Sequence, residues 1–183
     1  AVDAALDHLR AFNLRPIGEL TTRRVHEADW AQAWKAHFPV LRVGRRIVIR
    51  PSWRRHRRAA GDVVIALDPG MAFGTGDHPT TAMCLEEMDR ILSSRSNLSV
   101  LDVGTGSGAI ALALCKTNPG AAVFACDVSP EALAVARANA ERLGLAVTFL
   151  EGNLAEPLRA HGPFDLIVAN LPYVCAGDIP GLA

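Results

Sequence analysis

The sequence predicts an α/β protein organised around a parallel β-sheet, with a small N-terminal extension of helices and a β-ribbon. From residue 69 onward, Gly-rich turns separate strand-like and helix-like segments that alternate, which is typical of α/β domains. Helical segments separate the first three strand candidates, so parallel strands joined by right-handed crossovers are the economical topology. The predicted strands are 98–103, 122–127, 147–151 and 164–170, with helices at 108–116 and 130–144.

The N-terminal part differs in texture from the rest, and we divide the chain into an extension at 1–61 and a core at 62–183. Apolar residues recur at helical spacing in ALDHLRAF (5–12). A second helix is predicted in DWAQAWKAHF (29–38), because Asp29 is a suitable N-cap. Both helices are expected to be connecting elements.

A β-ribbon is predicted between these helices and the core. VLRVGRRIVIRPSW (40–53) alternates apolar and basic residues around Gly44, which indicates two strands with one solvated face. VVIALD (63–68) is a further buried strand. A glycine-bearing loop then leads into a helix that begins near Pro79, a residue suited to the first helical turn. Its apolar series is Met83, Leu85, Met88, Ile91 and Leu92.

The amino-acid composition limits the classes of protein to which the chain can belong. The chain has 183 residues, of which 50% are hydrophobic and 21% charged, and this excludes a disordered tail, a collagen-like chain and a mini-protein. The four cysteines form no CxxC pair and no His cluster lies near them, so we expect no metal site and a reduced, cytoplasmic protein. No apolar run reaches the roughly 20 residues that span a bilayer, and the first residues lack signal-peptide features.

The net charge of zero conceals two regions of opposite sign. Residues 1–61 carry 13 basic and 5 acidic side chains, whereas 62–183 carry 6 basic and 14 acidic ones. Eight arginines lie between Arg42 and Arg58. Such a run is either a solvated ribbon face or a surface that contacts rRNA or another acidic partner.

A glycine motif follows the first core strand and precedes a helix, in the order Asp102, Gly104, Gly106 and Gly108. Glycines allow a sharp turn and the close approach of a ligand, and the helix N-terminus adds positive potential. Asp127 ends the second strand 19 residues after Gly108, where a carboxylate can accept both hydroxyls of an adenosine ribose. We therefore expect a cofactor that contains adenosine.

The spacing of the glycines discriminates between cofactors. Dinucleotide sites prefer G-x-G-x-x-G, whereas this motif is G-x-G-x-G with an acid two residues ahead, the form found in S-adenosylmethionine (AdoMet) enzymes. AdoMet is the favoured cofactor. A nicotinamide cofactor and a structural glycine turn without a ligand remain alternatives.

The fourth strand ends in the tetrapeptide Asn170, Leu171, Pro172 and Tyr173, where open α/β sheets hold their ligands. It resembles the N-[PLI]-P-[YFW] motif of amino-group methyltransferases. The Asn170 side-chain oxygen and the Leu171 carbonyl can accept hydrogens from a substrate nitrogen, Pro172 fixes the turn, and the Tyr173 ring packs against the substrate. The alternative is an ordinary Asn turn after a strand.

Two families of class I AdoMet-dependent methyltransferases resemble different parts of the chain. Residues 29–92 resemble PrmA, the methyltransferase of a large-subunit ribosomal protein, above all in LDPGMAFGTGDHPTTAMCLE. Residues 98–183 resemble HemK (PrmC), which methylates a glutamine of release factors, in LDVGTGSGAIALAL, PEALAVARANAERLGL and DLIVANLPY. HemK chains usually have NPPY where this chain has Leu171. Both resemblances imply a Rossmann-like fold.

The resemblances also imply site residues. From PrmA, a lid and hydroxyl contacts over AdoMet are expected at Phe73, Thr75, Thr80 and Thr81. In HemK-like chains, the position of Asn153 is near the adenine. The remaining expected cofactor contacts are Asp102, Gly104, Thr105, Gly106, Gly108, Asp127, Val128 and Asn170. Asp77 stands where PrmA usually has Thr, and His78 is expected to anchor the helix start rather than to act as a base.

A complete sheet of this class carries three further strands after the fourth, but this chain ends 13 residues after Asn170. We therefore expect the C-terminal strands to be missing and the fourth strand to be an open edge that permits self-association. A fragment, or a fusion of two family halves, is the expectation.

The predicted function is N-methylation of a component of translation, either a ribosomal-protein amine or a release-factor glutamine amide. The two alternatives are an AdoMet-binding fragment without activity and a methyltransferase of nucleic-acid amino groups. A dehydrogenase is a more distant alternative.

Overall fold

The computed structural model describes residues 35, 38–68, 78–92, 95–154 and 156–171. The helices expected at 5–12 and 29–38 lie outside the described residues, apart from isolated positions of the second. One compact unit comprises Phe38–Ala183 and is described here by itself. None of the helices in the described ranges is long and apolar enough to cross a bilayer.

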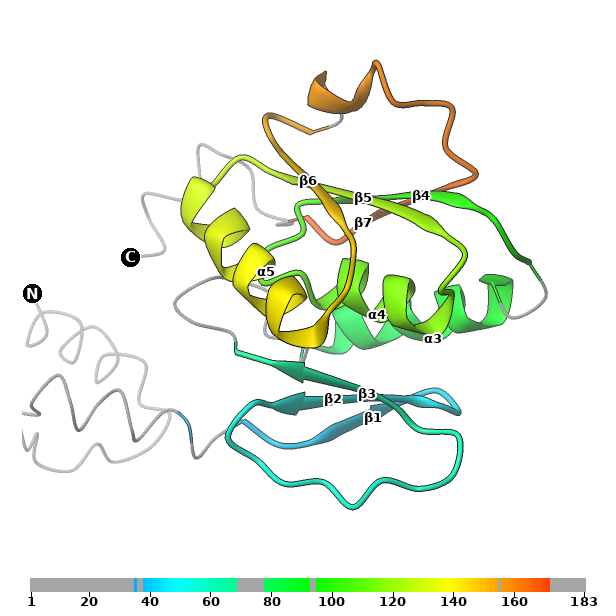
Figure 1. The fold of residues 1–183 in the computed structure, drawn as a ribbon, viewed down its shortest axis with the longest axis vertical. Coiled ribbons are helices and arrows are strands. Elements are labelled where there is room, and N and C mark those ends of the chain that lie inside the picture. The colour runs from blue at the N-terminus through cyan, green and yellow to red at the C-terminus, as the bar shows by residue number, and fades with distance from the viewer. Residues whose placement is uncertain (1–34, 36–37, 69–77, 93–94, 155, 172–183) are drawn as a thin grey trace, which may run out of the picture. The chain divides into compact units, whose positions relative to one another are not determined.

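The core of this unit is a four-stranded sheet, sheet B, in which every pair is parallel (Figure 1). Its strands are β4 (Ser99–Val103), β5 (Ala122–Asp127), β6 (Thr148–Glu151) and β7 (Leu166–Ala169). They confirm the four predicted strands. The order β6-β5-β4-β7 means that the chain leaves β4 on one side and returns to β7 on the other. The carboxyl ends of β4 and β7 therefore flank the switch point where such sheets bind ligands.

Two helices connect the first three strands, as predicted. Helix α4 (Ala109–Thr117) joins β4 to β5, and α5 (Pro130–Leu143) joins β5 to β6. The Ser129 side chain caps α5 by accepting from the Ala132 N–H, and Gly144 ends it in the left-handed conformation. The connection from β6 to β7 contains a short 3-10 helix, η2 (Glu156–Leu158).

A second sheet, sheet A, contains β1 (Leu41–Val43), β2 (Ile47–Pro51) and β3 (Val63–Leu67). Strands β1 and β2 pair antiparallel around Gly44, whose φ of 56° suits a tight turn, and this confirms the predicted ribbon. Strand β3 pairs parallel with β2 rather than with sheet B. The expected division after residue 61 therefore falls between two paired strands of one sheet.

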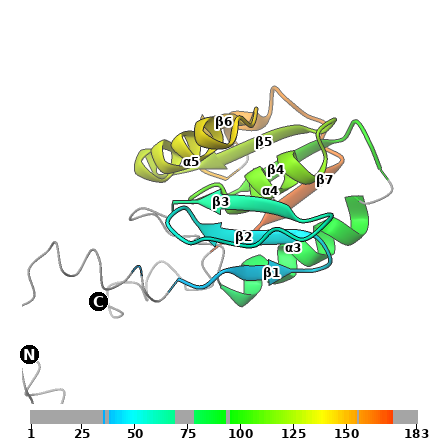
Figure 2. The same ribbon diagram turned by 60° about the horizontal axis from the view of Figure 1, so that its bottom comes forward.

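Helix α4 lies between the two sheets and contacts strands of both (Figures 1 and 2). Its residues Ala109–Leu114 are all buried, because one side faces sheet B and the other faces sheet A. Small alanines alternate with larger aliphatic residues there, which lets both sheets approach closely. The main apolar core accordingly joins sheet A, α3, α4, α5 and one face of sheet B.

Helix α3 (Pro79–Leu92) packs against α4 and β1. It begins at Pro79 as predicted. Its buried residues are Thr81, Leu85, Met88 and Leu92, a stripe at helical spacing. Met83 was expected in the apolar series, but it is 67% exposed, because it lies outside this stripe.

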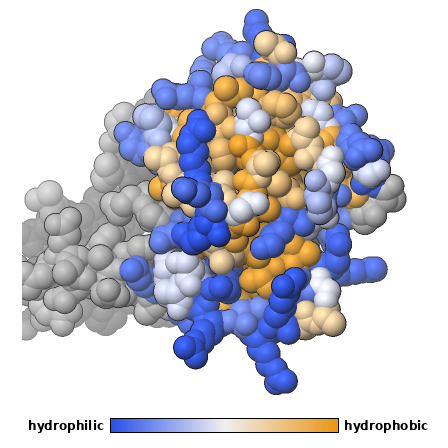
Figure 3. All heavy atoms as spheres, in the orientation of Figure 1, coloured by the Kyte–Doolittle hydropathy of each residue, from blue (hydrophilic) through white to orange (hydrophobic). Residues whose placement is uncertain are grey.

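The opposite face of sheet B carries a smaller apolar cluster. Leu101 and Val103 belong to it, whereas Val100 points to the main core, as alternation along a strand requires. The space-filling view shows hydrophilic side chains around most of the margin of the visible face and apolar ones towards its middle (Figure 3). The eight arginines between Arg42 and Arg58 belong to β1, β2 and the connections of sheet A.

Candidate functional site

The glycine motif forms a tight loop between β4 and α4. Gly104, Gly106 and Gly108 have φ values of 70°, 56° and 85°, which only glycine adopts without strain. The N–H groups of Gly104 and Thr105 both donate to the Cys126 carbonyl, at 2.9 and 3.0 Å. These bonds hold the loop against the end of β5. A Cβ at Gly108 would also lie only 3.2 Å from the Ala136 Cβ, so α5 packs directly on the loop.

Asp102 lies beneath this loop and is completely buried. Its Oδ2 accepts from the Thr105 hydroxyl at 2.7 Å and from the Ala111 N–H at 3.1 Å, in the first turn of α4. Its Oδ1 has no hydrogen-bond donor among the described residues. Burial raises the pKa of Asp102 to about 6, although the bonds from Thr105 and Ala111 favour the carboxylate. A carboxylate is therefore held at the centre of the site with one oxygen uncompensated.

Asp127 ends β5 beside the loop. Its Oδ2 accepts from the Gly106 N–H at 2.8 Å, and its Oδ1 accepts from the Ser129 N–H at 3.0 Å. Each oxygen has a further lone pair, so the carboxylate is oriented by backbone while it can still accept ligand hydroxyls. Val128, directly after it, is 70% exposed.

Asn153 lies close to Asp127 because the Gly152 N–H donates to the Asp127 carbonyl at 3.0 Å. Asn153 is exposed in the bend that follows β6. Its carbonyl accepts from the Glu156 N–H at the start of η2. The ends of β4, β5 and β6 thus bring three groups of predicted cofactor contacts to one edge of the sheet.

Asn170 and Leu171 follow β7 at the same edge. The Asn170 Nδ2 donates to the Thr81 hydroxyl at 3.0 Å, and Thr81 is itself buried in α3. A Cβ added at Gly104 would lie 2.6 Å from the Leu171 Cδ2, so Leu171 packs over the glycine loop. The structure therefore joins the tetrapeptide both to α3 and to the loop. Pro172 and Tyr173 lie outside the described residues.

The start of α3 is organised by His78. Its Nδ1 accepts from the Thr80 N–H at 3.3 Å and lies 2.7 Å from the Thr80 hydroxyl. His78 therefore caps the helix, which agrees with the role of an anchor. Phe73, Thr75 and Asp77 fall outside the described residues.

Asn139 is a residue of the site that the sequence reasoning missed. It is 1% exposed on α5. Its Nδ2 donates to the carbonyls of Asp68 and Ser107, at 3.0 and 2.9 Å, and its Oδ1 accepts from the Asp68 N–H at 2.9 Å. It thus ties the end of β3 to the glycine loop. The available signal was a polar residue on the apolar face of α5, in line with Ala132 and Ala136.

The order of the four strands, with the glycine loop at the switch point, places the chain among the class I methyltransferases, which have a Rossmann-like fold. One similar solved structure is a ribosomal protein L11 methylase from Lactobacillus delbrueckii subsp. bulgaricus. It has a TM-score of 0.64 and 35% sequence identity, and the match covers 72% of this chain and 66% of that one. A 16S rRNA methyltransferase of T. thermophilus, solved with AdoMet and guanosine, has a TM-score of 0.51 and 27% identity over 58% of this chain and 29% of that one.

The chain belongs to the ribosomal protein L11 methyltransferase (PrmA) family, whose model matches residues 2–173. A ribosomal protein L11 methyltransferase of Pelotomaculum thermopropionicum is 46% identical over 85% of this chain and 50% of its own length. The Chloroflexus aurantiacus protein of the same name is 48% identical over 84% of this chain and 46% of its own length. The chain thus spans about half the length of these curated relatives.

The PrmA match also covers residues 98–173, most of the part that resembles HemK. One family model therefore accounts for both parts of the chain. The glycine motif, Asp127 and Asn170 could not separate the two families, because these positions are expected to be cofactor contacts in both.

Proposed function

We propose that this chain carries the part of an AdoMet-dependent methyltransferase that binds the cofactor and the acceptor nitrogen, and that this nitrogen belongs to a ribosomal protein. Membership of the PrmA family supports this proposal. The observation that carries it is that the glycine loop, Asp127 and Asn170 lie at one edge of sheet B, after the neighbouring strands β4, β5 and β7. Cofactor and acceptor nitrogen would meet at this edge.

The donor set at the edge fits the adenosine part of AdoMet. The Asp127 oxygens, fixed by the Gly106 and Ser129 N–H groups, are proposed to accept the two ribose hydroxyls. Val128 offers exposed apolar surface to the adenine, and the Asn153 amide offers hydrogen bonds to it. Thr80 and Thr81 in α3, with Phe73 and Thr75 before it, are the proposed cover of the cofactor.

The charge of the edge fits the rest of AdoMet, which carries a positive sulfonium and an ammonium group. Asp102 and Asp127 place two carboxyl groups beside the loop, and the Asp102 Oδ1 has no donor among the described residues. Their negative potential favours a cationic ligand. When bound, AdoMet supplies a methyl group that is activated by the sulfonium for attack by a nitrogen lone pair. Close backbone approach is provided by Gly104, Thr105, Gly106 and Gly108.

The acceptor nitrogen is proposed to bind at the end of β7. The bond from the Asn170 Nδ2 to Thr81 fixes the amide, so its Oδ1 can accept a substrate N–H in a defined direction. The Leu171 carbonyl is the proposed second acceptor, and Pro172 and Tyr173, which lie outside the described residues, are the proposed remainder of the acceptor motif. Two acceptors orient the lone pair toward the methyl group, so positioning supplies most of the rate enhancement. An amine substrate must first lose its proton, and a dry site aids this by lowering the pKa of the amine.

The family name supports the proposed substrate class. The relatives are named for ribosomal protein L11, which favours a lysine or N-terminal amine of that protein over a release-factor glutamine. A nucleobase amine is the second candidate, since a similar structure is an rRNA methyltransferase that holds guanosine. A chain that binds AdoMet without transferring methyl groups is the remaining alternative.

The test combines AdoMet titration with transfer of labelled methyl groups into a ribosome-containing extract. Asn170→Ala should lower transfer about a hundredfold or more, because the nitrogen loses an acceptor that orients it, while AdoMet affinity changes about threefold or less. Asn118→Ala is the matched control, since Asn118 caps the opposite end of α4.

The outcomes separate the candidate functions. Label in a ribosomal protein supports the proposal, and label in nucleic acid selects the second candidate. AdoMet binding without transfer by the unaltered chain selects the inactive alternative. Equal transfer by Asn170→Ala and Asn118→Ala would refute the role of Asn170, and failure to bind AdoMet would refute the proposal itself.

A further inference from the structure

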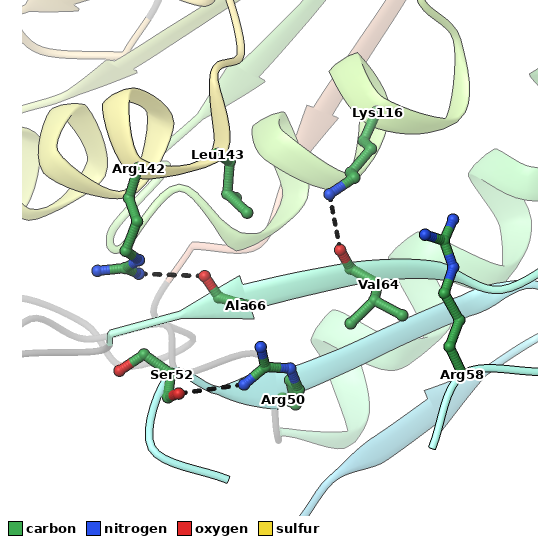
Figure 4. A pocket seen from close by; sticks show the side chains of 8 residues that line it. All are labelled: Arg50, Ser52, Arg58, Val64, Ala66, Lys116, Arg142 and Leu143. Carbon is green, nitrogen blue, oxygen red and sulfur yellow. Dashed lines mark hydrogen bonds between the residues drawn. The ribbon is translucent and has the colours of Figure 1, made fainter. Parts of the chain in front are cut away.

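A cavity of about 380 Å³ lies between sheet A and the C-terminal ends of two helices. Four cationic side chains line this basic cavity: Arg50 on β2, Arg58 in the β2–β3 connection, Lys116 at the end of α4 and Arg142 at the end of α5. Figure 4 shows Lys116 and Arg142 reaching β3 from the helices, while Arg50 and Arg58 approach from β2 and the connection. Three parts of the sequence that are distant from one another thus bring positive charge around one space.

The cationic groups are held in place by backbone carbonyls. Strand β3 is an edge of sheet A, and its Val64 and Ala66 carbonyls accept from the Lys116 Nζ at 2.9 Å and the Arg142 Nη2 at 3.1 Å. The Arg58 Nε donates to the Asp62 carbonyl at 3.0 Å. Such bonds satisfy an exposed sheet edge. A carbonyl is neutral, however, so these bonds fix the positive charges without compensating them.

Among the residues that the structure describes, no carboxylate lines the basic cavity. Within the described ranges, the ion pairs are made by other cations, namely Arg42, Arg46, His56 and Arg90. The pKa of Lys116 is lowered, first by partial burial and then by the charges of Arg58 and Arg50. The cations of the cavity therefore repel one another, and a bound anion would relieve this repulsion.

Helix ends explain only part of the cluster. Lys116 and Arg142 lie in the last turns of α4 and α5, where a basic residue is favoured by the helix dipole. Arg50 and Arg58 belong to no helix, yet they lie at the same cavity. A structural role for each residue alone does not account for their convergence.

We propose that the basic cavity binds phosphate groups. Guanidinium groups match phosphate oxygens in pairs, and a phosphate with several acceptor oxygens can bridge cations that come from different elements. The volume lies in the range of about 300–1,000 Å³ that is usual for ligand pockets. The phosphate belongs either to a small diphosphate compound or to an RNA backbone. This site is separate from the proposed methyl-transfer site and does not depend on it.

A first experiment uses the unaltered chain, which contains two lysines, Lys35 and Lys116. Acetylation of each lysine is followed by mass spectrometry with and without pyrophosphate. A bound anion stabilises the Lys116 ammonium, so its acetylation should slow about threefold or more, whereas Lys35 serves as the internal reference. Equal rates for Lys116 with and without pyrophosphate would overturn the proposal.

A second experiment compares two charge-matched double variants by pyrophosphate titration. R58Q/K116Q removes two cations of the cavity, and R55Q/R57Q removes two exposed cations of the same basic run that do not line it. R58Q/K116Q should weaken pyrophosphate binding about tenfold or more, and R55Q/R57Q about twofold. R58K/K116R keeps the charges and should retain most of the affinity, which separates charge loss from unfolding. Equal weakening by both neutral variants contradicts a defined site.

The remaining arms identify the source of the phosphate. Tighter binding of a short single-stranded RNA than of pyrophosphate, with the same loss in R58Q/K116Q, selects an RNA backbone, and the reverse order selects a small diphosphate compound. If polyglutamate binds as tightly as pyrophosphate and this binding is lost in R58Q/K116Q, the ligand is an acidic protein. That result would overturn the phosphate proposal. AdoMet affinity should be unchanged in every variant, so failure of this proposal is distinct from failure of the proposed function.

Discussion

Each of the two sheets carries one aspartate that is almost inaccessible, and the protein treats the two carboxyl groups in opposite ways. Asp62, at the start of β3, accepts from Arg42, His56 and the Ala59 N–H, and its pKa is lowered to about 2, mainly by the bond to His56. Asp102, in β4, has two uncharged donors, and burial raises its pKa to about 6. Burial is the leading cause at Asp102 and the bond to His56 is the leading cause at Asp62, so the balance between burial and hydrogen-bond donors decides which protonation state is favoured.

The difference between the two carboxyl groups bears on where a charged ligand can bind. Around Asp62 the charge is compensated within the protein, so that carboxylate serves the structure of sheet A. Around Asp102 compensation is incomplete, so a cationic ligand gains from binding there. In the basic cavity, positive charge is likewise not compensated by carboxylates among the described lining residues. Uncompensated charge therefore distinguishes the two candidate binding sites from the structural ion pairs of the same fold.

The largest effect is expected at Asn139, which connects the two sheets. Asn139→Ala removes three hydrogen bonds to the backbone of Asp68 and Ser107, and should lower the free energy of unfolding by about 3 kcal/mol. Glu141→Gln, two residues later on α5, changes an exposed side chain and should cost about 0.5 kcal/mol or less. Urea unfolding measures both. Similar losses for the two variants would show that Asn139 does not join the sheets energetically.

The next effect concerns pH. Because the pKa of Asp102 is higher in the folded than in the unfolded chain, the folded state holds more protons between about pH 4 and 6, and stability falls as the pH rises through this window. Asp102→Asn should abolish that fall and raise the free energy of unfolding at pH 8 by about 2 kcal/mol. It should also weaken AdoMet binding. Denaturant unfolding across the pH range checks the profile.

Asp62 provides the contrasting profile. Its lowered pKa stabilises the fold above the unfolded pKa of about 4, and this contribution is lost as the pH falls toward about 2. Asp62→Asn should therefore flatten the dependence of the free energy of unfolding on pH below pH 4. It should leave the dependence between about pH 4 and 6, which is due to Asp102, unchanged. If either single variant changed the stability profile in both pH ranges, the two carboxyl groups would not act independently, and the contrast between the two sheets would be wrong.

The last predictions concern two glycines with positive φ, Gly108 and Gly144. Gly108→Ala should cost about 2 kcal/mol and weaken AdoMet binding, because the backbone is strained and the new Cβ meets Ala136 at 3.2 Å. Gly144→Ala, at the end of α5, should cost about 1 kcal/mol with no change in AdoMet binding, since nothing lies within 4 Å of its Cβ. Thermal unfolding and AdoMet titration distinguish them. An equal loss of AdoMet affinity in both variants would show that the glycine loop has no specific role in AdoMet binding.

Local patterns were sufficient for much of the fold. The strands of sheet B, the ribbon around Gly44 and the helix start at Pro79 are confirmed, since each depends on periodicity and turn residues that are close in sequence. The partner of β3 was not predictable, because an apolar strand has the same pattern in either sheet. The exposure of Met83 had the same origin, since spacing alone does not say which side of a helix faces the core.

The candidate site was predictable where one short segment carries it, as in the glycine loop and the residues after β7. It was not predictable where contacts join distant segments. Asn139 meets Asp68 across 71 positions, and the four cations of the basic cavity come from four elements. Helix and strand periodicity do not predict contacts between distant segments, because such contacts depend on tertiary packing.

The burial of α4 between two sheets bears on how the protein can be handled in the laboratory. A shorter piece beginning at Gly61 would lack β1 and β2, and β3 would lose the strand with which it pairs. Strand β2 also contacts α4, so part of the apolar surface of that helix would lose its cover, and exposed apolar patches promote aggregation. The basic ribbon therefore covers apolar surface of the unit, and we expect a piece without it to aggregate more readily.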